Sequence, residues 1–279
     1  MKLLESVAEF RRARAEASGS LGLVPTMGYL HRGHMALVKR AREENDSVAV
    51  SIFVNPTQFG PSEGYQTYPR DLRRDLELLK PEGVKLVFAP PPEEIYAPGF
   101  DTWVELGALA ERLEGASRPD HFRGVATVVM KLFNIVRPDR AYFGQKDAQQ
   151  VLVIEKMVAD LDLGLAVVAV PTVREPDGLA ISSRNTHLSP EERKAATVLW
   201  SSLSAARDRW AQGEARARIL KKVITSTIEK EPLARLDYVS TADPKSLEEM
   251  DTIDRPTLVS LAVWIGKTRL IDNITLEGR

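Results

Sequence analysis

Residues 21–54 read LGLVPTMGYLHRGHMALVKRAREENDSVAVSIFV, and this stretch decides the fold class. Two short apolar runs, Leu21–Pro25 and Ser47–Val54, predict strands, and the apolar residues of His34–Glu44 between them recur with the period of a helix. The apolar runs are continuous and do not alternate with polar residues, which is typical of parallel strands buried on both faces. A strand–helix–strand unit of this kind predicts a parallel sheet covered by helices.

The alternation of strands and helices continues to about residue 170. Further strands are predicted at three apolar runs, the last of which reads as fully buried: Val84–Phe88, Ala141–Phe143 and Leu165–Val170. Helical periods occur between them at Arg70–Leu79, Val125–Val136 and Ala148–Val158. We therefore expect residues 1–176 to form one α/β domain around a doubly wound parallel sheet.

A second, smaller domain is expected in residues 177–279. Glu175-Pro176-Asp177-Gly178 has the composition of a turn and is the expected hinge between the domains. Ser189-Pro190-Glu191-Glu192 is a capping-box sequence, which predicts the start of helices that run through about Glu231. Three strands are predicted after them, at Leu236–Ser240, Leu258–Val263 and Leu270–Thr275, with a hairpin turn at Gly266-Lys267. The second domain is therefore expected to be α+β.

Composition excludes several classes of protein. The 279 residues include no cysteine, which excludes disulfides, thiolate catalysis and cysteine-bound metal sites. The 38 basic and 39 acidic residues nearly cancel, so no broad basic surface for a nucleic acid is expected. The longest apolar runs have seven or eight residues, far short of the ~20 that span a bilayer. Because Met1–Ala17 also lacks a signal-peptide core, we expect a cytoplasmic protein with no membrane partner.

Glycines and histidines follow the first predicted strand in the sequence PTMGYLHRGH, residues 25–34. Ligands of an open α/β sheet bind beyond the carboxyl ends of its strands, and a helix N-terminus there offers N–H groups to phosphates. His31 and His34 can donate hydrogen bonds to phosphoryl oxygens. The alternative is a capping and packing pair; a zinc site is disfavoured, since only His121 and His187 remain as further histidine ligands.

Two more motifs lie where a strand is expected to end. Asn55 and Gln58 follow the second strand and suit a small polar acid, unless their amides only satisfy the local backbone. Lys146 and Asp147 follow the strand at Ala141–Phe143. Lys146 supplies a mobile charge for phosphate, and Asp147 can orient it or a magnesium-bound water; the alternative is a turn with solvated charges.

A fourth motif comprises Val173 and the run ISSRN, residues 181–185, just past the expected hinge. Its two hydroxyls and its guanidinium match triphosphate oxygens, and the alternative is a polar loop before the capping box. His121–Gly124 is a weaker candidate for anion contact, from the loop before the buried helix. Because three of the four main motifs follow strands of one sheet, we expect one pocket for a nucleotide and a small acid.

At these residues the sequence resembles a known family. His31-Arg32-Gly33-His34 matches the His-x-Gly-His signature that several adenylyltransferases and class I aminoacyl-tRNA synthetases share. The combination of motifs, in this order and over nearly the whole chain, resembles the pantoate–β-alanine ligase family. This family belongs to the nucleotidyltransferase superfamily that carries the His-x-Gly-His signature. The matching stretches are Pro25–His34, Asn55–Gly60, His121–Lys131, Gly144–Gln150 and Ser182–Asn185.

The resemblance implies a fold and an activity. The first domain is expected to be Rossmann-like and to hold the active site, and the second is expected to act as a lid, usually in a homodimer. Pantoate would attack the α-phosphorus of ATP to give pantoyl adenylate and pyrophosphate, and the amine of β-alanine would then displace AMP. Mg²⁺ is expected to accompany the triphosphate.

The resemblance also assigns roles to residues. His34, with His31 and Lys146, is expected to carry the catalysis. Gln58 and Gln150 are expected to hold pantoate, with Gln58 also lying against β-alanine. The ATP site is implied at seventeen positions in four stretches: Met27, Gly28, Tyr29, Leu30, His31, Arg32, Gly33, His34, Gly144, Gln145, Lys146, Asp147, Val173, Ile181, Ser182, Ser183 and Arg184.

Some assignments and functions stay open from the sequence. Gln145 and Ile181 stand where the family often has Glu and Met, which removes no charge that the mechanism needs. No metal ligand is assigned, Asp71 and Asp75 being weak candidates, and no general base is assigned for the amine. A nucleotidyltransferase that leaves AMP on its product, or an ATP-binding regulatory protein, are alternative functions. An aminoacyl-tRNA synthetase is disfavoured, because the chain lacks length for an anticodon-binding module and a broad basic surface.

Overall fold

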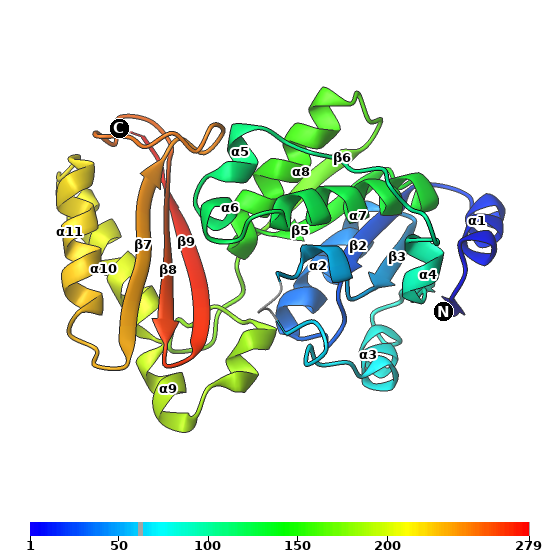
Figure 1. Cartoon of the computed structure of the whole chain (residues 1–279), viewed down its shortest axis with the longest axis horizontal. Helices are drawn as coiled ribbons and strands as arrows, with labels where there is room; N and C mark the ends of the chain where they lie inside the picture. Colours follow the sequence, from blue (N-terminus) through cyan, green and yellow to red (C-terminus); the bar gives the residue numbers. More distant parts are fainter. Residues whose placement is uncertain (61–63, 279) are drawn as a thin grey trace. The chain divides into compact units, whose positions relative to one another are not determined.

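The computed structural model describes residues 1–60 and 64–278, and it divides into two compact units (Figure 1). The first unit comprises Met1–Gln145 and Gln149–Pro171; the second comprises Lys146–Ala148 and the described residues from Thr172 onward. The turn at residues 175–178 is present, since Gly178 N donates to Glu175 O at 2.9 Å. The expected domain boundary at residues 176 and 177, and the role of this turn as a hinge, stay predictions.

The first unit is built on a sheet of six parallel strands in the order β1-β4-β3-β2-β5-β6. The strand order reverses between β2 and β5, because β3 and β4 lie on one side of β2 while β5 and β6 lie on the other. A doubly wound α/β sheet was expected, and it is confirmed. The strands are β1 (Lys2–Leu4), β2 (Leu21–Thr26), β3 (Ser47–Ile52), β4 (Leu86–Phe88), β5 (Arg140–Gly144) and β6 (Ala166–Val170).

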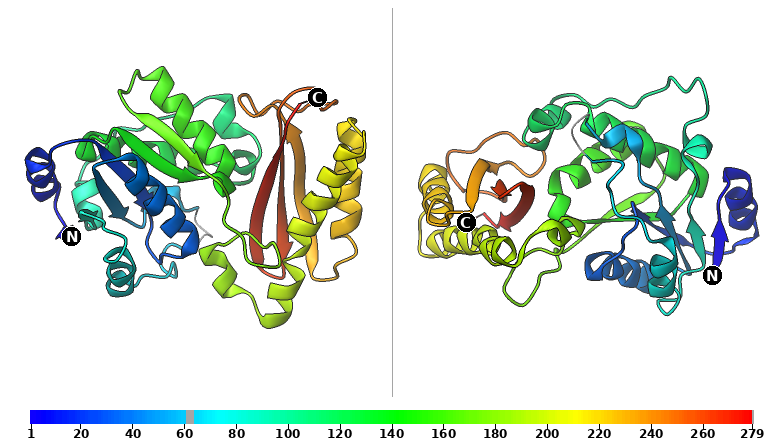
Figure 2. Two further views of the ribbon diagram at one scale, coloured as in Figure 1. Left: turned by 180° about the vertical axis from the view of Figure 1, so that it is seen from behind. Right: turned by 60° about the horizontal axis from the view of Figure 1, so that its bottom comes forward.

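Helices cover both faces of this sheet. In β2, Leu21 and Leu23 pack on the side of α1 (Val7–Glu16), α7 (His121–Val136) and α8 (Ala148–Asp160). Val24 points to the opposite side, toward α2 (Arg32–Glu44) and α3 (Leu72–Leu79). Figure 1 shows α7 across one face, and the left view of Figure 2 shows α2 across the other. Short helical turns complete this part of the chain: η1 (Pro56–Gln58), α4 (Pro92–Ile95), α5 (Ala108–Glu111), α6 (Glu114–Ser117) and η2 (Gln145–Asp147).

Strand β6 is less buried than the sequence predicted. It was expected to be fully buried, and that prediction was wrong, because Ala166 and Ala169 are exposed and only Val170 is buried. Among the described residues β6 pairs with β5 alone, at the edge of the sheet. An apolar run of this length indicates a strand, but it does not say how many neighbours that strand has.

Helix α7 begins four residues earlier than the expected Val125, at His121. His121–Gly124 was expected to be a loop, and that prediction was wrong, because these residues form the first turn of the helix. Gly124 has a packing reason, since a Cβ atom there would lie 2.4 Å from the Thr57 carbonyl oxygen. Buried residues lie nearly all round α7. None of the described helices, α7 included, combines the length and the hydrophobicity that crossing a bilayer requires.

The N-terminal elements β1 and α1 were not predicted. Helix α1 starts at a capping box in which the Ser6 side chain accepts from Glu9 N and the Glu9 carboxylate accepts from Ser6 N. It buries only Phe10 and Ala13, so its apolar pattern is weak in the sequence.

The second unit is a smaller α+β structure, as expected. Its three strands form an antiparallel sheet in the order β7-β8-β9, with one face covered by α10 and α11 (Figure 2). The capping box at Ser189 and Glu192 is confirmed, and Gly266-Lys267 joins β8 to β9. The elements are η3 (Ser183–His187), α9 (Pro190–Ala195), α10 (Val198–Ala211), α11 (Ala217–Ile228), β7 (Ala234–Ala242), β8 (Thr257–Ile265) and β9 (Thr268–Leu276).

Candidate active site

The loop after β2 leaves the sheet at the point where the strand order reverses. Gly28 has a φ of +81° and Tyr29 a φ of +52°, so the chain turns sharply in the left-handed region. A Cβ atom at Gly28 would lie 2.9 Å from Ile52 Cγ2 and 3.0 Å from Asp75 Oδ2. Glycine is therefore required at this position both for its backbone conformation and for the space it leaves.

The side chain of Asp75 holds this loop from α3. Its Oδ2 accepts from Tyr29 N at 2.8 Å and its Oδ1 accepts from Leu30 N at 2.7 Å, while the side chain has no exposed surface. Burial raises the pKa of Asp75, and the hydrogen bonds from Leu30 and Tyr29 act in the opposite direction. Both oxygens are engaged by the backbone, and Asp71 caps α3 through a bond from Arg74 N. These two residues therefore have structural roles, which argues against them as magnesium ligands.

The two histidines of the signature stack against each other at the start of α2. His31 precedes the helix in an extended conformation, and its ring centroid lies 4.0 Å from that of His34. His34 Nδ1 accepts a hydrogen bond from His31 N at 3.3 Å. Because an accepting nitrogen carries no proton, the neutral His34 ring carries its proton on Nε2. Nε2–H is a donor suited to a phosphoryl oxygen.

The side chain of Gln58 lies beside the same loop, after β3. Its Nε2 is 3.4 Å from Met27 Sδ, and its Oε1 accepts from Asn55 Nδ2 at 3.0 Å. The Gln58 carbonyl oxygen lies 2.9 Å from His121 Nδ1 and accepts from Arg118 Nη2 at 3.4 Å. The structure thus brings the expected pantoate residue next to the expected ATP residue Met27, and it fixes both the backbone and the side chain of Gln58.

In the second unit, Val173 and Ile181 lie side by side at the base of the turn. Ile181 N donates to Val173 O at 3.0 Å. The neighbouring Arg174 forms two bonds to the buried Asp272 of β9, at 2.6 and 2.9 Å, and its guanidinium lies 3.9 Å from the centroid of the Trp200 ring. A buried two-point ion pair therefore anchors this turn to the sheet.

The other expected phosphate-binding residues of the second unit are also tied to β9. Lys146 O accepts from Asn273 Nδ2 at 2.9 Å, and Lys146 Nζ lies 3.4 Å from Asp147 Oδ1. Arg184 lies in η3, and its Nη1 is 3.5 Å from the Arg269 carbonyl oxygen. Within this unit, the three segments that carry Lys146, Val173 and Arg184 meet along one strand.

Three other expected site residues lie at or after the end of β5. Gly144 ends β5, the strand that pairs with β2, and Gln145 follows it in η2. Gln150 lies half-buried in the first turn of α8. Its neighbour Gln149 is buried and has a structural role, since its Nε2 donates to the carbonyl oxygens of Leu109 and Arg112. The role of Gln150 in pantoate binding stays a prediction.

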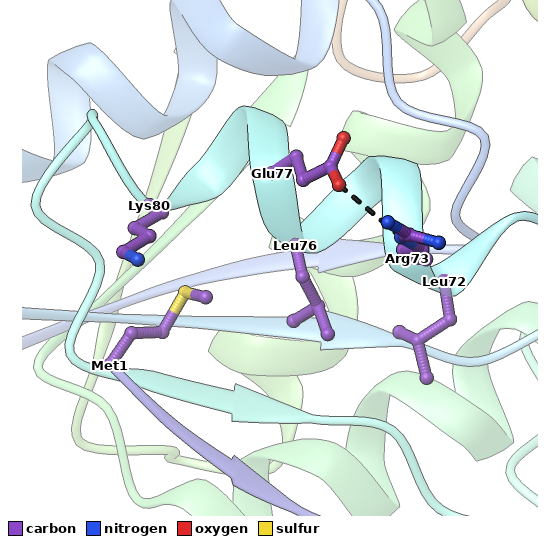
Figure 3. Close-up of a pocket in the computed structure, with 6 residues that line it drawn as sticks. All are labelled: Met1, Leu72, Arg73, Leu76, Glu77 and Lys80. Atoms are coloured by element: carbon purple, nitrogen blue, oxygen red, sulfur yellow. Dashed lines mark ion pairs between the residues drawn. The ribbon is translucent and has the colours of Figure 1, made fainter.

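A shallow hollow of about 370 Å³ lies elsewhere on the first unit, between Met1 and α3. Figure 3 shows Met1, Leu72 and Leu76 around it, with an ion pair of 3.4 Å between Arg73 and Glu77. None of its lining residues belongs to the candidate site, so the hollow is separate from that site. Within residues 1–60 and 64–278, no three His, Asp or Glu side chains gather in a way that could hold a metal ion.

The model of the family described as pantoate-beta-alanine ligase matches residues 2–275. The chain belongs to this family. The pantothenate synthetase of Roseiflexus sp. (strain RS-1) is 60% identical over 278 residues, which are 100% of both chains. The crystal structure of pantothenate synthetase from Thermus thermophilus is 50% identical, covers 98% of this chain and 99% of its own, and gives a TM-score of 0.94. The structure of pantoate-beta-alanine ligase from Francisella tularensis, complexed with beta-gamma ATP and beta-alanine, is 36% identical over 98% of this chain and 97% of its own, with a TM-score of 0.81.

Sequence reasoning found the loops of this pantoate–β-alanine ligase family member but missed the residues that anchor them. The sequence offers Asp75 only as a weak candidate metal ligand, and none of its motifs includes Asp272 or Asn273. The sequence contains no local signal for these anchors, because Asn273 is 127 residues from the lysine whose carbonyl oxygen it binds. An acidic residue at a position where a helix should be buried, as at Asp75, is a signal that could have been used.

Proposed function

We propose that this chain is an ATP-dependent ligase that joins pantoate to β-alanine through a pantoyl adenylate and releases pyrophosphate and AMP. Membership of the pantoate–β-alanine ligase family along residues 2–275 supports the overall reaction. The structural observation that carries the proposal is the Asp75-held loop with its stacked histidines, at the reversal of a parallel sheet. Sheets of this kind bind nucleotides at such a reversal.

The first step brings two anions together. An oxygen of the pantoate carboxylate attacks the α-phosphorus of ATP, and the bond from that phosphorus to the pyrophosphate oxygen breaks. We assign His34 Nε2–H as a donor to the phosphoryl group, and His31, Lys146 and Arg184 as further groups that offset negative charge as it develops. Gln58 holds pantoate, because its amide is fixed beside Met27 of the nucleotide loop.

The second step consumes the adenylate. The neutral amine of β-alanine attacks the acyl carbon, the bond to the AMP oxygen breaks, and the amine nitrogen loses a proton. A mixed anhydride of this kind hydrolyses in water, so the reaction needs a closed site. The lid role expected for residues 177–279 belongs to the proposal for this reason.

The proposal includes Mg²⁺, a homodimer and a cytoplasmic location. The described residues form no cluster of three metal-binding side chains, and Asp75 has both oxygens engaged by the backbone. Mg²⁺ is commonly held by substrate phosphates and water rather than by a protein cage. We therefore propose that it arrives on ATP as part of the substrate. The homodimer and the location rest on the family resemblance.

The deciding experiment measures AMP and pyrophosphate release from ATP, Mg²⁺ and pantoate, with and without β-alanine. AMP that accumulates over many turnovers only when both pantoate and β-alanine are present supports the ligase activity. Pyrophosphate without AMP would favour a nucleotidyltransferase or another amine acceptor. Absence of nucleotide turnover under every condition would overturn the proposed function.

A further inference from the structure

Tyr96 lies outside every motif of the sequence, yet its hydroxyl reaches the candidate site. The residue follows α4, and its hydroxyl donates to Asn55 Oδ1 at 2.8 Å. The same hydroxyl lies 3.1 Å from Thr57 Oγ1. A tyrosine from a distant loop is therefore part of the polar network at the end of β3.

This network decides which way the Asn55 amide faces. Asn55 Oδ1 accepts from Tyr96, from Thr57 Oγ1 at 2.9 Å and from Thr57 N at 3.4 Å. With donors gathered on the oxygen, Asn55 Nδ2 is turned to the other side, where it donates to Gln58 Oε1 and to Gly124 O at 3.1 Å. Asn55 is only 1% exposed, so water cannot easily replace a lost partner.

The orientation of Asn55 in turn decides the orientation of Gln58. Gln58 Oε1 is engaged as an acceptor by Asn55, so its amide nitrogen faces the other way, toward Met27 Sδ. An amide nitrogen carries two N–H groups, which are donors for a carboxylate or hydroxyl oxygen of an acid. If Asn55 turned over, its Oδ1 would face the acceptor Gln58 Oε1, and Gln58 would also have to turn.

The ring of Tyr96 is held firmly enough to impose this order. Its centroid lies 5.0 Å from that of Phe100, in an edge-on arrangement, and 6.2 Å from that of Phe53. The Lys131 ammonium lies 5.8 Å from the Tyr96 ring centroid. Burial raises the pKa of Tyr96 to about 12, so the hydroxyl keeps its proton and remains a donor at neutral pH.

We propose that Tyr96 is a positioning residue for pantoate, which sets the direction of the Gln58 amide through Asn55. The proposal rests on the assignment of pantoate to Gln58 in the proposed function. It predicts that removal of the Tyr96 hydroxyl lowers the affinity for pantoate and leaves the affinity for ATP nearly unchanged.

The first test is Tyr96→Phe, with steady-state KM measured separately for pantoate, ATP and β-alanine. We expect the KM for pantoate to rise by about 5- to 30-fold, as for the loss of one partner in a buried hydrogen-bond network. The KM for ATP should stay within about twofold, because the Asp75-held loop is unchanged.

Tyr142→Phe is the matched control. Tyr142 is fully buried, whereas Tyr96 is half-buried; the pKa of Tyr142 is also raised to about 12, and its hydroxyl bonds to Glu44 and Asn45 at the end of α2. Its loss should lower the melting temperature without changing the KM for pantoate. A comparable rise in that KM would show that any buried tyrosine hydroxyl has this effect, and would overturn the proposal.

A double-mutant cycle with Gln58→Ala tests the relay itself. If Tyr96 acts through Gln58, adding Tyr96→Phe to Gln58→Ala should cause no further rise in the KM for pantoate. Fully additive effects, or an equal rise in KM for pantoate and ATP, would overturn the proposal. Thr57→Val removes another donor to Asn55 and should give the same selective change, which keeps the test open should Tyr96→Phe fold poorly.

The two proposals fail in different ways. If the wild-type chain needs no pantoate for turnover, the proposed function fails. If pantoate is required and Gln58→Ala raises its KM selectively, but Tyr96→Phe leaves that KM unchanged, only the role of Tyr96 fails.

Discussion

Two segments that carry residues expected to bind ATP, the Met27–Leu30 loop and the turn between Val173 and Ile181, are each held by one buried aspartate, but in different ways. Asp75 accepts two backbone N–H groups of the loop, at 2.8 and 2.7 Å. Asp272 accepts two bonds from the guanidinium of Arg174, at 2.6 and 2.9 Å. The first anchor binds the peptide chain directly, whereas the second binds it through a side chain.

The difference shows what each anchor can contribute. Neutral amides offset only part of the cost of burying a charge, which agrees with the raised pKa of Asp75. A guanidinium offers an opposite charge in matching geometry, but its removal leaves a carboxylate buried without compensation. The loop should therefore respond to changes at Asp75 mainly in its conformation, and the turn should respond to changes at Arg174 mainly in its stability.

The largest effect is expected for Arg174→Met. Met keeps an apolar stem against Trp200 but leaves Asp272 buried and unpaired, so the free energy of unfolding should fall by about 3 to 5 kcal/mol in urea denaturation. Arg193→Met is the control, because it breaks the exposed pair with Asp177 and should cost about 0 to 1 kcal/mol. Equal losses in the two variants would contradict the contrast between buried and exposed pairs.

Removing one catalytic candidate from each of the two units comes next. We expect His34→Ala and Lys146→Ala each to lower the rate of adenylate formation by roughly 100-fold or more, because each removes charge stabilisation at the reacting phosphate. Pyrophosphate release measures the rate, and circular dichroism checks that both variants are folded. Near-normal turnover in either variant would remove that residue from the catalytic set.

Asp75→Asn sharpens the comparison on the side of the loop. The amide turns an N–H group toward a backbone N–H, so stability should fall by about 1 to 3 kcal/mol, and the KM for ATP should rise. Asp71→Asn, which alters the cap of the same helix, is the control and should have little effect, because Asn caps as well as Asp. A normal KM for ATP in Asp75→Asn would mean that the anchor does not shape the nucleotide loop.

The smallest expected effect is a difference in titration between Asp75 and Asp177. Burial raises the pKa of Asp75 above its ordinary 3.8, so its contribution to stability falls as pH rises from 3.8 through the raised value. The bond from Arg193 lowers the pKa of Asp177, whose contribution is present above 3.8 and is lost as pH falls through the lowered value. Carboxyl ¹³C NMR should show Asp75 titrating at the higher pH; the reverse order would refute both assignments.

The sheet and its helices could be predicted because they leave local signals. The apolar runs at Leu21–Pro25 and Ser47–Val54 and the capping box at Ser189 each lie within a few consecutive residues. The exposure of β6 could not be predicted, because it depends on which strands become its neighbours. The loops of the candidate site were found for the same local reason, although the functions of their residues stay predictions.

The anchors of the site depend on contacts between distant residues. Asp75 is 45 residues from Leu30, and Tyr96 is 41 residues from Asn55. No periodicity or motif links such pairs, because they meet only when the sheet has placed them together. Sequence reasoning therefore found the residues on the contiguous motifs and missed those that hold them in position.

If Gln58 binds pantoate as proposed, the glycine at the start of α7 has a consequence for engineering the acid specificity. A Cβ atom at Gly124 would collide with the backbone of Thr57 and Gln58, which no rotamer change can relieve. The distance between α7 and the Thr57–Gln58 backbone is therefore fixed. Mutant libraries that select for a longer acid substrate should not vary Gly124. Under the same proposal Met27 is the position to vary instead, because its flexible thioether lies 3.4 Å from the Gln58 amide nitrogen.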